Sequence, residues 1–219
     1  WYNKMEKLRT FDTIIDVMAI SKEHIACARR DNEISVLNRE NGYLHATLKG
    51  HTNLITKMII HGDRIISGSQ DGTIKIWKHF MLERTITAHR GKVTGLVVHG
   101  DKLFSSENYG YVKIWDINTG ELVKRLLTKL EDKDYYKGDW VEHISVDGDR
   151  LVSAGKFVVH IWNINTGELI RKLNIDDPGM TALKGDFLVT SEVKRYNITK
   201  QNPRPTILNK FQSLVSIYN

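Results

Sequence analysis

One phrase recurs along the chain at a nearly constant interval. Residues 112–122 (VKIWDINTGEL) return almost letter for letter as residues 159–169 (VHIWNINTGEL), and residues 74–78 (IKIWK) carry a shorter version. Equivalent positions fall at residues 1, 37, 77, 115, 162 and 196, which makes five steps over 195 residues, or about 39 residues a step. A fixed period of this size is the signature of a repeat architecture, in which each unit buries its apolar face against its neighbours.

Each repeat has the pattern of four short strands. Residues 55–60 and 65–67 are rich in isoleucine, and the turn Gly62-Asp63 separates them. Glycine-aspartate turns return at residues 100–101, 148–149 and 185–186. Glycine supplies the positive φ that a two-residue hairpin requires. The period and the strands predict an all-β fold, a β-propeller of four-stranded antiparallel blades. The expected blades are 13–48, 54–87, 92–127, 141–173 and 180–208.

Two further segments have the pattern of single strands. Met5–Phe11 is typical of the fourth strand of an earlier blade, and Phe211–Tyr218 of the first strand of a later one. About five complete blades with partial strands at both ends predict an incomplete ring, a fragment of a seven-bladed propeller. We therefore expect an open arc, or closure by pairing of these two strands in one incomplete blade.

Composition limits the partners and the compartment. The net charge of +6 comes from 32 basic and 26 acidic residues, and no block of five like charges occurs, so no nucleic-acid partner is expected. No apolar run approaches the ~18 residues of a membrane span. Cys27 is the single cysteine, which suits a reducing compartment, cytoplasmic or nuclear. The nine histidines are scattered and no phosphate-cradling glycine loop occurs, so we expect neither a metal nor a cofactor.

One set of residues has the composition of a catalytic triad. His51, Ser67 and Asp71 invite that interpretation. However, His89 and Ser105 repeat the first two members at the same spacing, with Tyr109 in place of the aspartate. An active site is normally built once, whereas a network that holds a fold is copied with its repeat. We therefore expect a structural network, no catalytic residues and no enzyme activity in this chain.

These residues resemble the WD-repeat β-propeller family. The resemblance lies in Gly50-His51, Ser67, Asp71 and Trp77-Lys78, followed by Trp115-Asp116 in the next unit. In that family the four residue types form a buried hydrogen-bonded tetrad within one blade, which the second unit would have in full and the third and fourth in part. The first unit keeps only Asp31, and Lys137 lies near the histidine position of the fourth. The implied tetrad residues are His51, Ser67, Asp71, Trp77, His89, Ser105, Trp115, Ser153 and Trp162.

The short hairpins also resemble a narrower group, the F-box/WD-repeat substrate receptors of ubiquitin ligases and the propellers attached to myosin heavy-chain kinases. The resemblance implies a protein-interaction scaffold or adaptor that presents a rim of loops, and the narrower resemblance implies such a substrate receptor. Two alternatives stay open: a targeting propeller attached to a kinase or other enzyme domain outside this chain, and a structural subunit of a larger assembly. Some receptors grip phosphopeptides with arginines, but here only Arg30, helped by Arg29 and Lys156, keeps the charge.

An insertion at residues 128–140 lengthens the interval between the third and fourth units. Its aromatic side chains Tyr135, Tyr136 and Trp140 are of the kind that anchors protein interfaces, or they fold back as a local cap. A protein or peptide partner is expected on the rim formed by the turns between second and third strands, together with this insertion. The expected rim residues are Arg29, Arg30, Gln70, Asn108, Tyr109, Tyr135, Tyr136, Trp140, Lys156 and Phe157.

Overall fold

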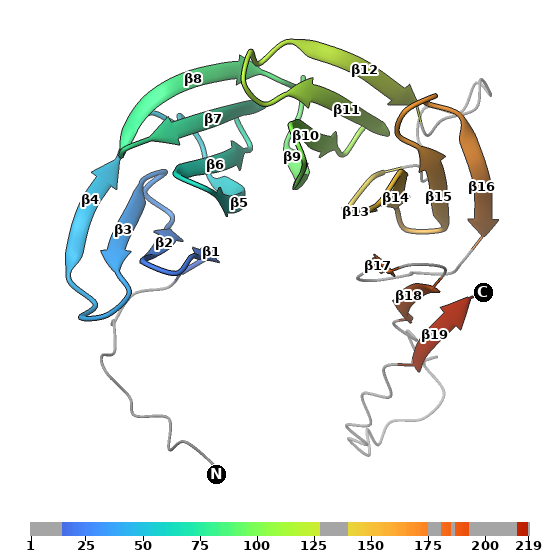
Figure 1. The fold of residues 1–219 in the computed structure, drawn as a ribbon, viewed down its shortest axis with the longest axis horizontal. Helices are drawn as coiled ribbons and strands as arrows, with labels where there is room; N and C mark the ends of the chain where they lie inside the picture. Colours follow the sequence, from blue (N-terminus) through green and yellow to red (C-terminus); the bar gives the residue numbers. More distant parts are fainter. Residues whose placement is uncertain (1–14, 128–139, 175–180, 185–186, 193–213, 219) are drawn as a thin grey trace, which may run out of the picture.

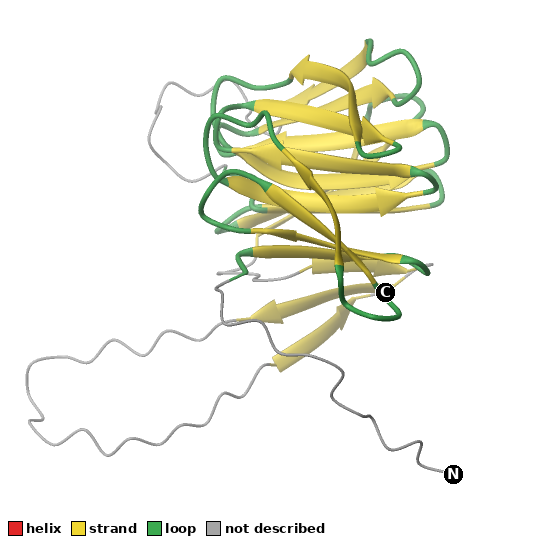
Figure 2. Cartoon of the chain, turned by 90° about the vertical axis from the view of Figure 1, so that its left-hand side faces the viewer, coloured by secondary structure: helices red, strands yellow, loops and turns green. Residues whose placement is uncertain are grey.

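A computed structural model describes residues 15–127, 140–174, 181–184, 187–192 and 214–218. Their regular structure consists of strands joined by turns and loops (Figure 2). No helix in this described part of the chain could cross a membrane. The strands of the first two sheets are β1 (Val17–Ile20), β2 (His24–Ala28), β3 (Ile34–Asn38), β4 (Leu44–Leu48), β5 (Ile55–His61), β6 (Arg64–Ser69), β7 (Thr73–Lys78) and β8 (Met81–Thr87).

Three more sheets follow along the chain. The third contains β9 (Val93–His99), β10 (Lys102–Glu107), β11 (Tyr111–Asp116) and β12 (Leu122–Leu127). The fourth contains β13 (His143–Asp147), β14 (Arg150–Ala154), β15 (Val158–Asn163) and β16 (Leu169–Asn174). The fifth contains β17 (Thr181–Lys184), β18 (Phe187–Glu192) and β19 (Leu214–Tyr218).

The sheets are arranged side by side around an arc (Figure 1). In the first four, the strands follow one another in sequence order and each pair is antiparallel. The first strand of each sheet lies on the inside of the arc, where β1, β5, β9, β13 and β17 are neighbours, and the fourth lies on the outside. The expected fold class, a β-propeller of four-stranded antiparallel blades, is confirmed.

The fifth sheet corrects one expectation about the end of the chain. Residues 211–218 were expected to supply the first strand of a later blade. Instead, Leu214–Tyr218 forms the third strand of the fifth sheet, antiparallel to β18, with Val189 opposite Ile217. The physical reason is that, without a third strand, the β17–β18 hairpin would leave the backbone groups of β18 unpaired at its edge. An extended segment can pair with this edge whether it follows directly in the sequence or comes from further along the chain. Met5–Phe11 lies outside the described residues, and the arc is open between β1 and the fifth sheet in Figure 1.

The core lies between successive blades. Ile66 and Ile76 of the second sheet pack with Val93 and Leu103 of the third in one buried cluster. Glycine allows the sheets to approach closely, since a Cβ on Gly68 would lie 2.6 Å from Cγ1 of Val93. Threonines join the same surfaces, because Thr56 Oγ1 donates to the Val93 carbonyl (2.5 Å). Thr94 Oγ1 likewise donates to the Val141 carbonyl (2.5 Å).

The outer strands are tied together by long cationic side chains. Arg84 in β8 donates to the Asn118 carbonyl (3.1 Å) in the β11–β12 turn of the next blade. One blade further along, Lys124 in β12 donates to the carbonyls of Asn165 (2.9 Å) and Thr166 (2.8 Å). The repeated sequence therefore forms the same acceptor turn twice. The outer strands β8 and β12 each bind the turn between the third and fourth strands of the next blade.

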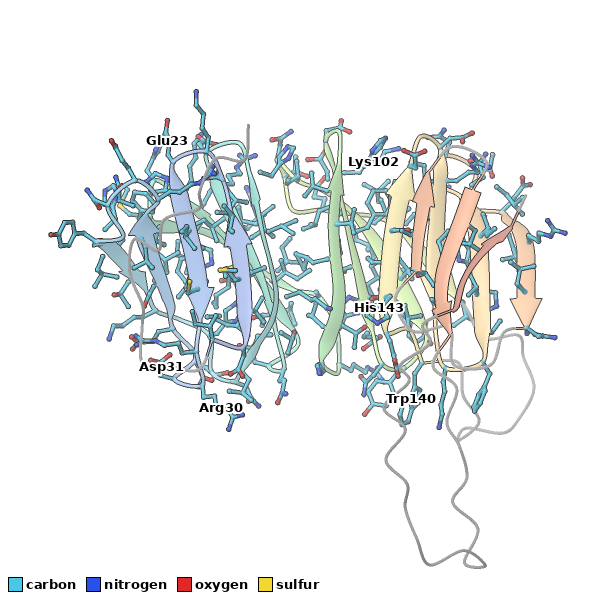
Figure 3. All side chains as sticks on the ribbon, turned by 90° about the horizontal axis from the view of Figure 1, so that it is seen from below. Glu23, Arg30, Asp31, Lys102, Trp140 and His143 are labelled. Atoms are coloured by element: carbon cyan, nitrogen blue, oxygen red, sulfur yellow. The ribbon has the colours of Figure 1, made fainter. Side chains whose placement is uncertain are left out.

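The strand order gives the arc two rims. Rim A carries the turns between second and third strands and the connections between blades, and rim B carries the two remaining kinds of turn. Figure 3 shows Arg30, Asp31 and Trp140 at one end of the blades and Glu23 and Lys102 at the other. In residue numbers, rim A comprises 29–33, 49–54, 70–72, 88–92, 108–110, 140–142 and 155–157, and rim B comprises 21–23, 39–43, 62–63, 79–80, 100–101, 117–121, 148–149 and 164–168.

Candidate functional site

The second blade contains a continuous chain of four hydrogen-bonded side chains. Trp77 Nε1–H donates to Ser67 Oγ (2.9 Å), and Ser67 Oγ lies 2.8 Å from Nε2 of His51. On the other side of the ring, His51 Nδ1 lies 2.9 Å from Oδ2 of Asp71. Because the tryptophan can only donate, the Ser67 hydroxyl is left to donate to Nε2, and the ring proton then lies on Nδ1 and faces Asp71. This proton order satisfies every member.

Electrostatics fits a neutral histidine beside an ionised acid. Burial lowers the pKa of His51, and its hydrogen bond to Asp71 opposes that shift only in part. Burial alone would raise the pKa of Asp71. The hydrogen bonds from Thr73, Thr52 and His51 outweigh it and lower this pKa to about 2. The Thr73 hydroxyl (2.6 Å) and the amides of Thr52 (3.0 Å) and Thr73 (2.8 Å) donate to the carboxylate.

The same geometry bears on the triad interpretation. Ser67 is 0% exposed and the His51 side chain is fully buried. A hydroxyl in that position cannot attack a substrate that arrives from solvent. Its oxygen accepts from the buried Trp77 N–H, and its proton is donated to His51 Nε2. The arrangement therefore joins the β4–β5 connection, β6 and β7 of one blade.

The third blade contains an acid that sequence spacing did not identify. His89 Nε2 lies 2.8 Å from Ser105 Oγ, which also accepts from Trp115 Nε1–H (2.8 Å). The position equivalent to Asp71 holds Tyr109, and this blade was expected to lack the acid. Glu107 supplies it, with Oε1 at 3.5 Å from His89 Nδ1 and Oε2 accepting from the Gly91 amide (3.3 Å). Glu107 is two residues nearer the serine, and its longer side chain reaches the same histidine.

The first and fourth blades keep less of the network. Trp162 Nε1–H donates to Ser153 Oγ (3.0 Å), and the buried His160 ring lies 5.6 Å from the Trp162 ring. In the first blade, Cys27 and Leu37 are buried where the serine and tryptophan would stand. Burial raises the pKa of the Cys27 thiol, so it behaves as a small apolar group. Lys137 lies outside the described residues.

The two arginines expected on rim A each face a carboxylate. Arg29 donates to Ser35 Oγ (3.2 Å) and lies 3.6 Å from Oδ2 of Asp31. Arg30 is exposed and lies 3.7 Å from Oδ2 of Asp16. Much of their charge is therefore offset locally, which weakens the case for an anion site on the first blade.

The remaining rim A residues form an aromatic and polar surface. Tyr109 is 56% exposed, Trp140 is 53% exposed, and Phe157 has the ammonium of Lys156 at 5.2 Å from its ring. Gln70 is exposed and Asn108 is half-buried. Tyr135 and Tyr136 lie outside the described residues. A Cβ on Gly155 would lie 2.0 Å from the Trp140 carbonyl oxygen, so this close contact fixes the backbone of Trp140 against the next turn.

Two hollows lie along rim A, on either side of the Asn108-Tyr109 turn. The inner one has a volume of about 370 Å³, and burial and nearby Lys92 lower the pKa of Lys57 in its wall. The outer one, of about 460 Å³, opens beside Tyr109. The inner hollow is lined by Thr56, Lys57, Lys92, Thr94, Asn108, Trp140 and Glu142. The outer hollow is lined by Arg90, Glu107, Tyr109, Tyr111, Lys113 and Arg125.

Rim B contains a larger hollow of about 530 Å³ between the first two blades. Phe80 and His24 line it, and their rings pack at 5.1 Å. Volume alone therefore does not select a rim. The described residues contain no group of three or more metal-ligating side chains on either rim.

Comparison with known proteins agrees with the geometry of the blades. Residues 42–78 and 80–116 each match the family "WD domain, G-beta repeat". The chain is 43% identical over 53 residues to periodic tryptophan protein 2 homolog of Caenorhabditis elegans, which is 24% of this chain and 6% of that protein. It is 32% identical over 78 residues to the tRNA (guanine-N(7)-)-methyltransferase non-catalytic subunit wdr4 of Danio rerio, 33% of this chain and 19% of that protein.

The matched segments therefore span only a small part of these relatives. Among solved structures, that of U3-55K aligns over 84% of this chain and 60% of that chain, with a TM-score of 0.71 at 21% identity. That likeness shows the fold. With the repeat matches, the blade topology and the hydrogen-bonded networks of two successive blades, the chain is a WD-repeat β-propeller.

Proposed function

We propose that this chain binds a protein or peptide on rim A and takes no catalytic part itself. A WD-repeat propeller is typically a protein-interaction scaffold. The observation that carries the choice of rim is the pair of neighbouring hollows beside the Asn108-Tyr109 turn, flanked by exposed Tyr109 and Trp140. Rigid strands hold these loops, while the aromatic side chains remain free for contact, as in interface anchors.

Charge on rim A supports a polar or acidic partner surface. Lys57 and Lys92 line the inner hollow together with Glu142, so its wall carries two cations and one carboxylate. Trp140 contributes apolar area at the same edge. Aromatic area next to a few charges is the composition found in many protein interfaces.

The finer assignment is a substrate-receptor or adaptor module, for example in a ubiquitin ligase. The compact glycine-aspartate hairpins at Gly62, Gly100 and Gly148 support it. A targeting propeller attached to an enzyme domain outside this chain is the alternative, together with a structural subunit of a larger assembly. The relative named as a non-catalytic methyltransferase subunit supports a role beside an enzyme. We also propose a reducing compartment, cytoplasmic or nuclear, which a single buried thiol would suit.

The test compares the two rims with matched aromatic positions. A photo-crosslinking amino acid replaces Tyr109 on rim A in one protein and Tyr43, which is 65% exposed on rim B, in another. We expect the first to capture a partner that mass spectrometry identifies and the second not to. The purified partner should then bind the unmodified chain and lose affinity for Trp140→Ala. Capture of the same partner through Tyr43 alone would contradict the assignment to rim A.

A further inference from the structure

The outer hollow on rim A is surrounded by cations on a single blade. We propose that it binds the phosphate group of a phosphorylated side chain on a peptide partner, an inference that rests on the proposed function of rim A. Arg90 comes from the β8–β9 connection, Lys113 from β11 and Arg125 from β12. The hollow of about 460 Å³ lies between them, with Tyr109 and Tyr111 completing its wall.

Two of these cations stand in opposed positions that cost stability. Lys113 and Arg125 lie directly opposite each other in the β11–β12 register. Like charges in directly opposed positions destabilise a strand pair. The Lys113 ammonium relieves part of the conflict by donating to the Ala88 carbonyl. Burial, and then the nearby Arg125 and Arg90, still lower the pKa of Lys113 against the opposing effect of Glu107.

Among the residues that the structure describes, no available carboxylate balances the two arginines. Glu107 lines the hollow, but it is buried and faces His89 and the Gly91 amide. Across the described ranges, the side chains of Arg90 and Arg125 form no hydrogen bond or ion pair with another described residue. The hollow therefore has a positive field and guanidinium donors that are open to a ligand.

The preceding blade provides an internal comparison on the same backbone. Thr52 follows His51 as Arg90 follows His89, and Thr85 lies opposite Lys75 as Arg125 lies opposite Lys113. In that blade, Lys75 donates to the Thr85 hydroxyl (2.9 Å), so the single cation has a neutral partner. At these two positions of the repeat, the second blade therefore has uncharged threonines and the third blade has arginines.

The chemistry of the hollow fits a phosphate monoester on a side chain. Arginine forks bind phosphate oxygens through two parallel hydrogen bonds, and the ammonium of Lys113 adds a third positive group. The volume falls within the range of small-ligand sites, which leaves room for the carbon atoms that carry the phosphate against the two tyrosines. Nucleic acid needs a charged track along its backbone, whereas here the neighbouring Thr52 and Thr85 are neutral.

The test uses the whole 219-residue chain with isotope labels on its tyrosine rings. Phenyl phosphate is titrated while the ring signals of Tyr109 and Tyr111 are followed by NMR, with benzyl alcohol as the uncharged probe. We expect those signals to shift with phenyl phosphate only. The double variant Arg90→Gln/Arg125→Gln should bind it at least about tenfold more weakly, because charge-assisted contacts to phosphate are lost. The control Lys172→Gln, at the equivalent exposed position of the fourth blade, should bind normally.

A degenerate phosphopeptide pool, before and after phosphatase treatment, identifies the source of the phosphate. Binding that phosphatase abolishes supports the proposal. Tighter binding of a uridine hexanucleotide than of the phosphopeptide pool would overturn it, as would unchanged phenyl phosphate affinity in the double arginine variant. A partner that is lost in Trp140→Ala but held fully by the double arginine variant would overturn the phosphate site alone. A partner held by rim B would overturn the proposed function.

Discussion

Oε1 of Glu107, in strand β10, lies 3.5 Å from Nδ1 of His89. In the repeat, Glu107 stands two positions before the one that Asp71 occupies in the β6–β7 turn of the preceding blade. Adjacent blades therefore bring an acid to the equivalent histidine from different positions in the sequence. Asp71 lies 2.9 Å from its histidine and accepts three further hydrogen bonds, whereas Glu107 accepts one from the Gly91 amide. The network of the second blade should consequently contribute more to stability than that of the third.

Removing the two acids tests this ranking. Asp71→Ala leaves the buried Nδ1–H of His51 and the donors of Thr52 and Thr73 without an acceptor, and we expect a loss of about 1–3 kcal/mol in the free energy of unfolding. Glu107→Ala should cost less, since its contacts are longer. Denaturant unfolding measures both, with Asp63→Ala on rim B as the exposed control. A larger loss for Glu107→Ala than for Asp71→Ala would contradict the ranking. Partner binding by Asp71→Ala at low temperature should not change.

Acid should destabilise the chain in two stages. Burial lowers the pKa of His51, His89 and His143 below that of an unfolded chain, so folding disfavours their protonation. Their contribution is complete above the ordinary histidine pKa of about 6.5 and decreases below it. Asp71, with its pKa lowered from 3.8 to about 2, stabilises the fold above pH 4 and loses that contribution as the pH falls toward 2.

The pKa values of Asp63, Glu83, Glu107 and Asp116 are lowered as well, so the contribution of Asp71 to the second stage is isolated with a variant. Asp71→Asn cannot titrate, so its unfolding free energy should lack a decrease on the order of 2 kcal/mol between about pH 4 and pH 2. Unfolding curves recorded at intervals from pH 7 to pH 2 measure both stages. A wild-type chain and a variant with parallel curves below pH 4 would show that Asp71 does not carry this dependence.

The close approach of the second and third blades depends on Gly68. Gly68→Ala would place its Cβ 2.6 Å from Cγ1 of Val93, and we expect overpacking to cost about 1–3 kcal/mol. Val93→Ala should also destabilise the chain, because it leaves a cavity. In the double variant the shorter side chain at position 93 gives the new methyl group room. The double variant should therefore lose less stability than the sum of the two single losses. Additive losses would mean that the two residues are not coupled.

Sequence reasoning found what the repeat copies. The spacing of His51, Ser67, Asp71 and Trp77 identified a complete network because each member occupies its repeat-fixed position. Glu107 escaped that reasoning because it replaces a serine, Ser69, and its reach depends on side-chain length. A buried acid in a strand close to a buried histidine was the available signal.

The repeat period could not predict the position of residues that the repeat does not copy. Leu214–Tyr218 pairs with β18 by the free edge of a hairpin, which sequence order does not specify. Arg90 and Arg125 are 35 residues apart and meet only through the β11–β12 register and the preceding connection. The carboxylates that face Arg29 and Arg30 likewise became visible only in three dimensions.

Trp140 should be the main apolar anchor of the rim A interface. Its side chain is 53% exposed at the edge of the inner hollow, while Gly155 packs against its backbone. Trp140→Ala should weaken affinity for the captured partner by about 2 kcal/mol or more, since tryptophan is enriched among the few residues that dominate the energy of an interface. Tyr135→Ala and Tyr136→Ala should add to the loss, and all three variants should melt within a few degrees of the unmodified chain. Lys156→Ala should cost less than about 1 kcal/mol, because an exposed charge contributes little. Calorimetric titration with the purified partner measures these differences, with Tyr43→Ala as the rim B control; equal affinities for Trp140→Ala and Tyr43→Ala would remove Trp140 from the interface.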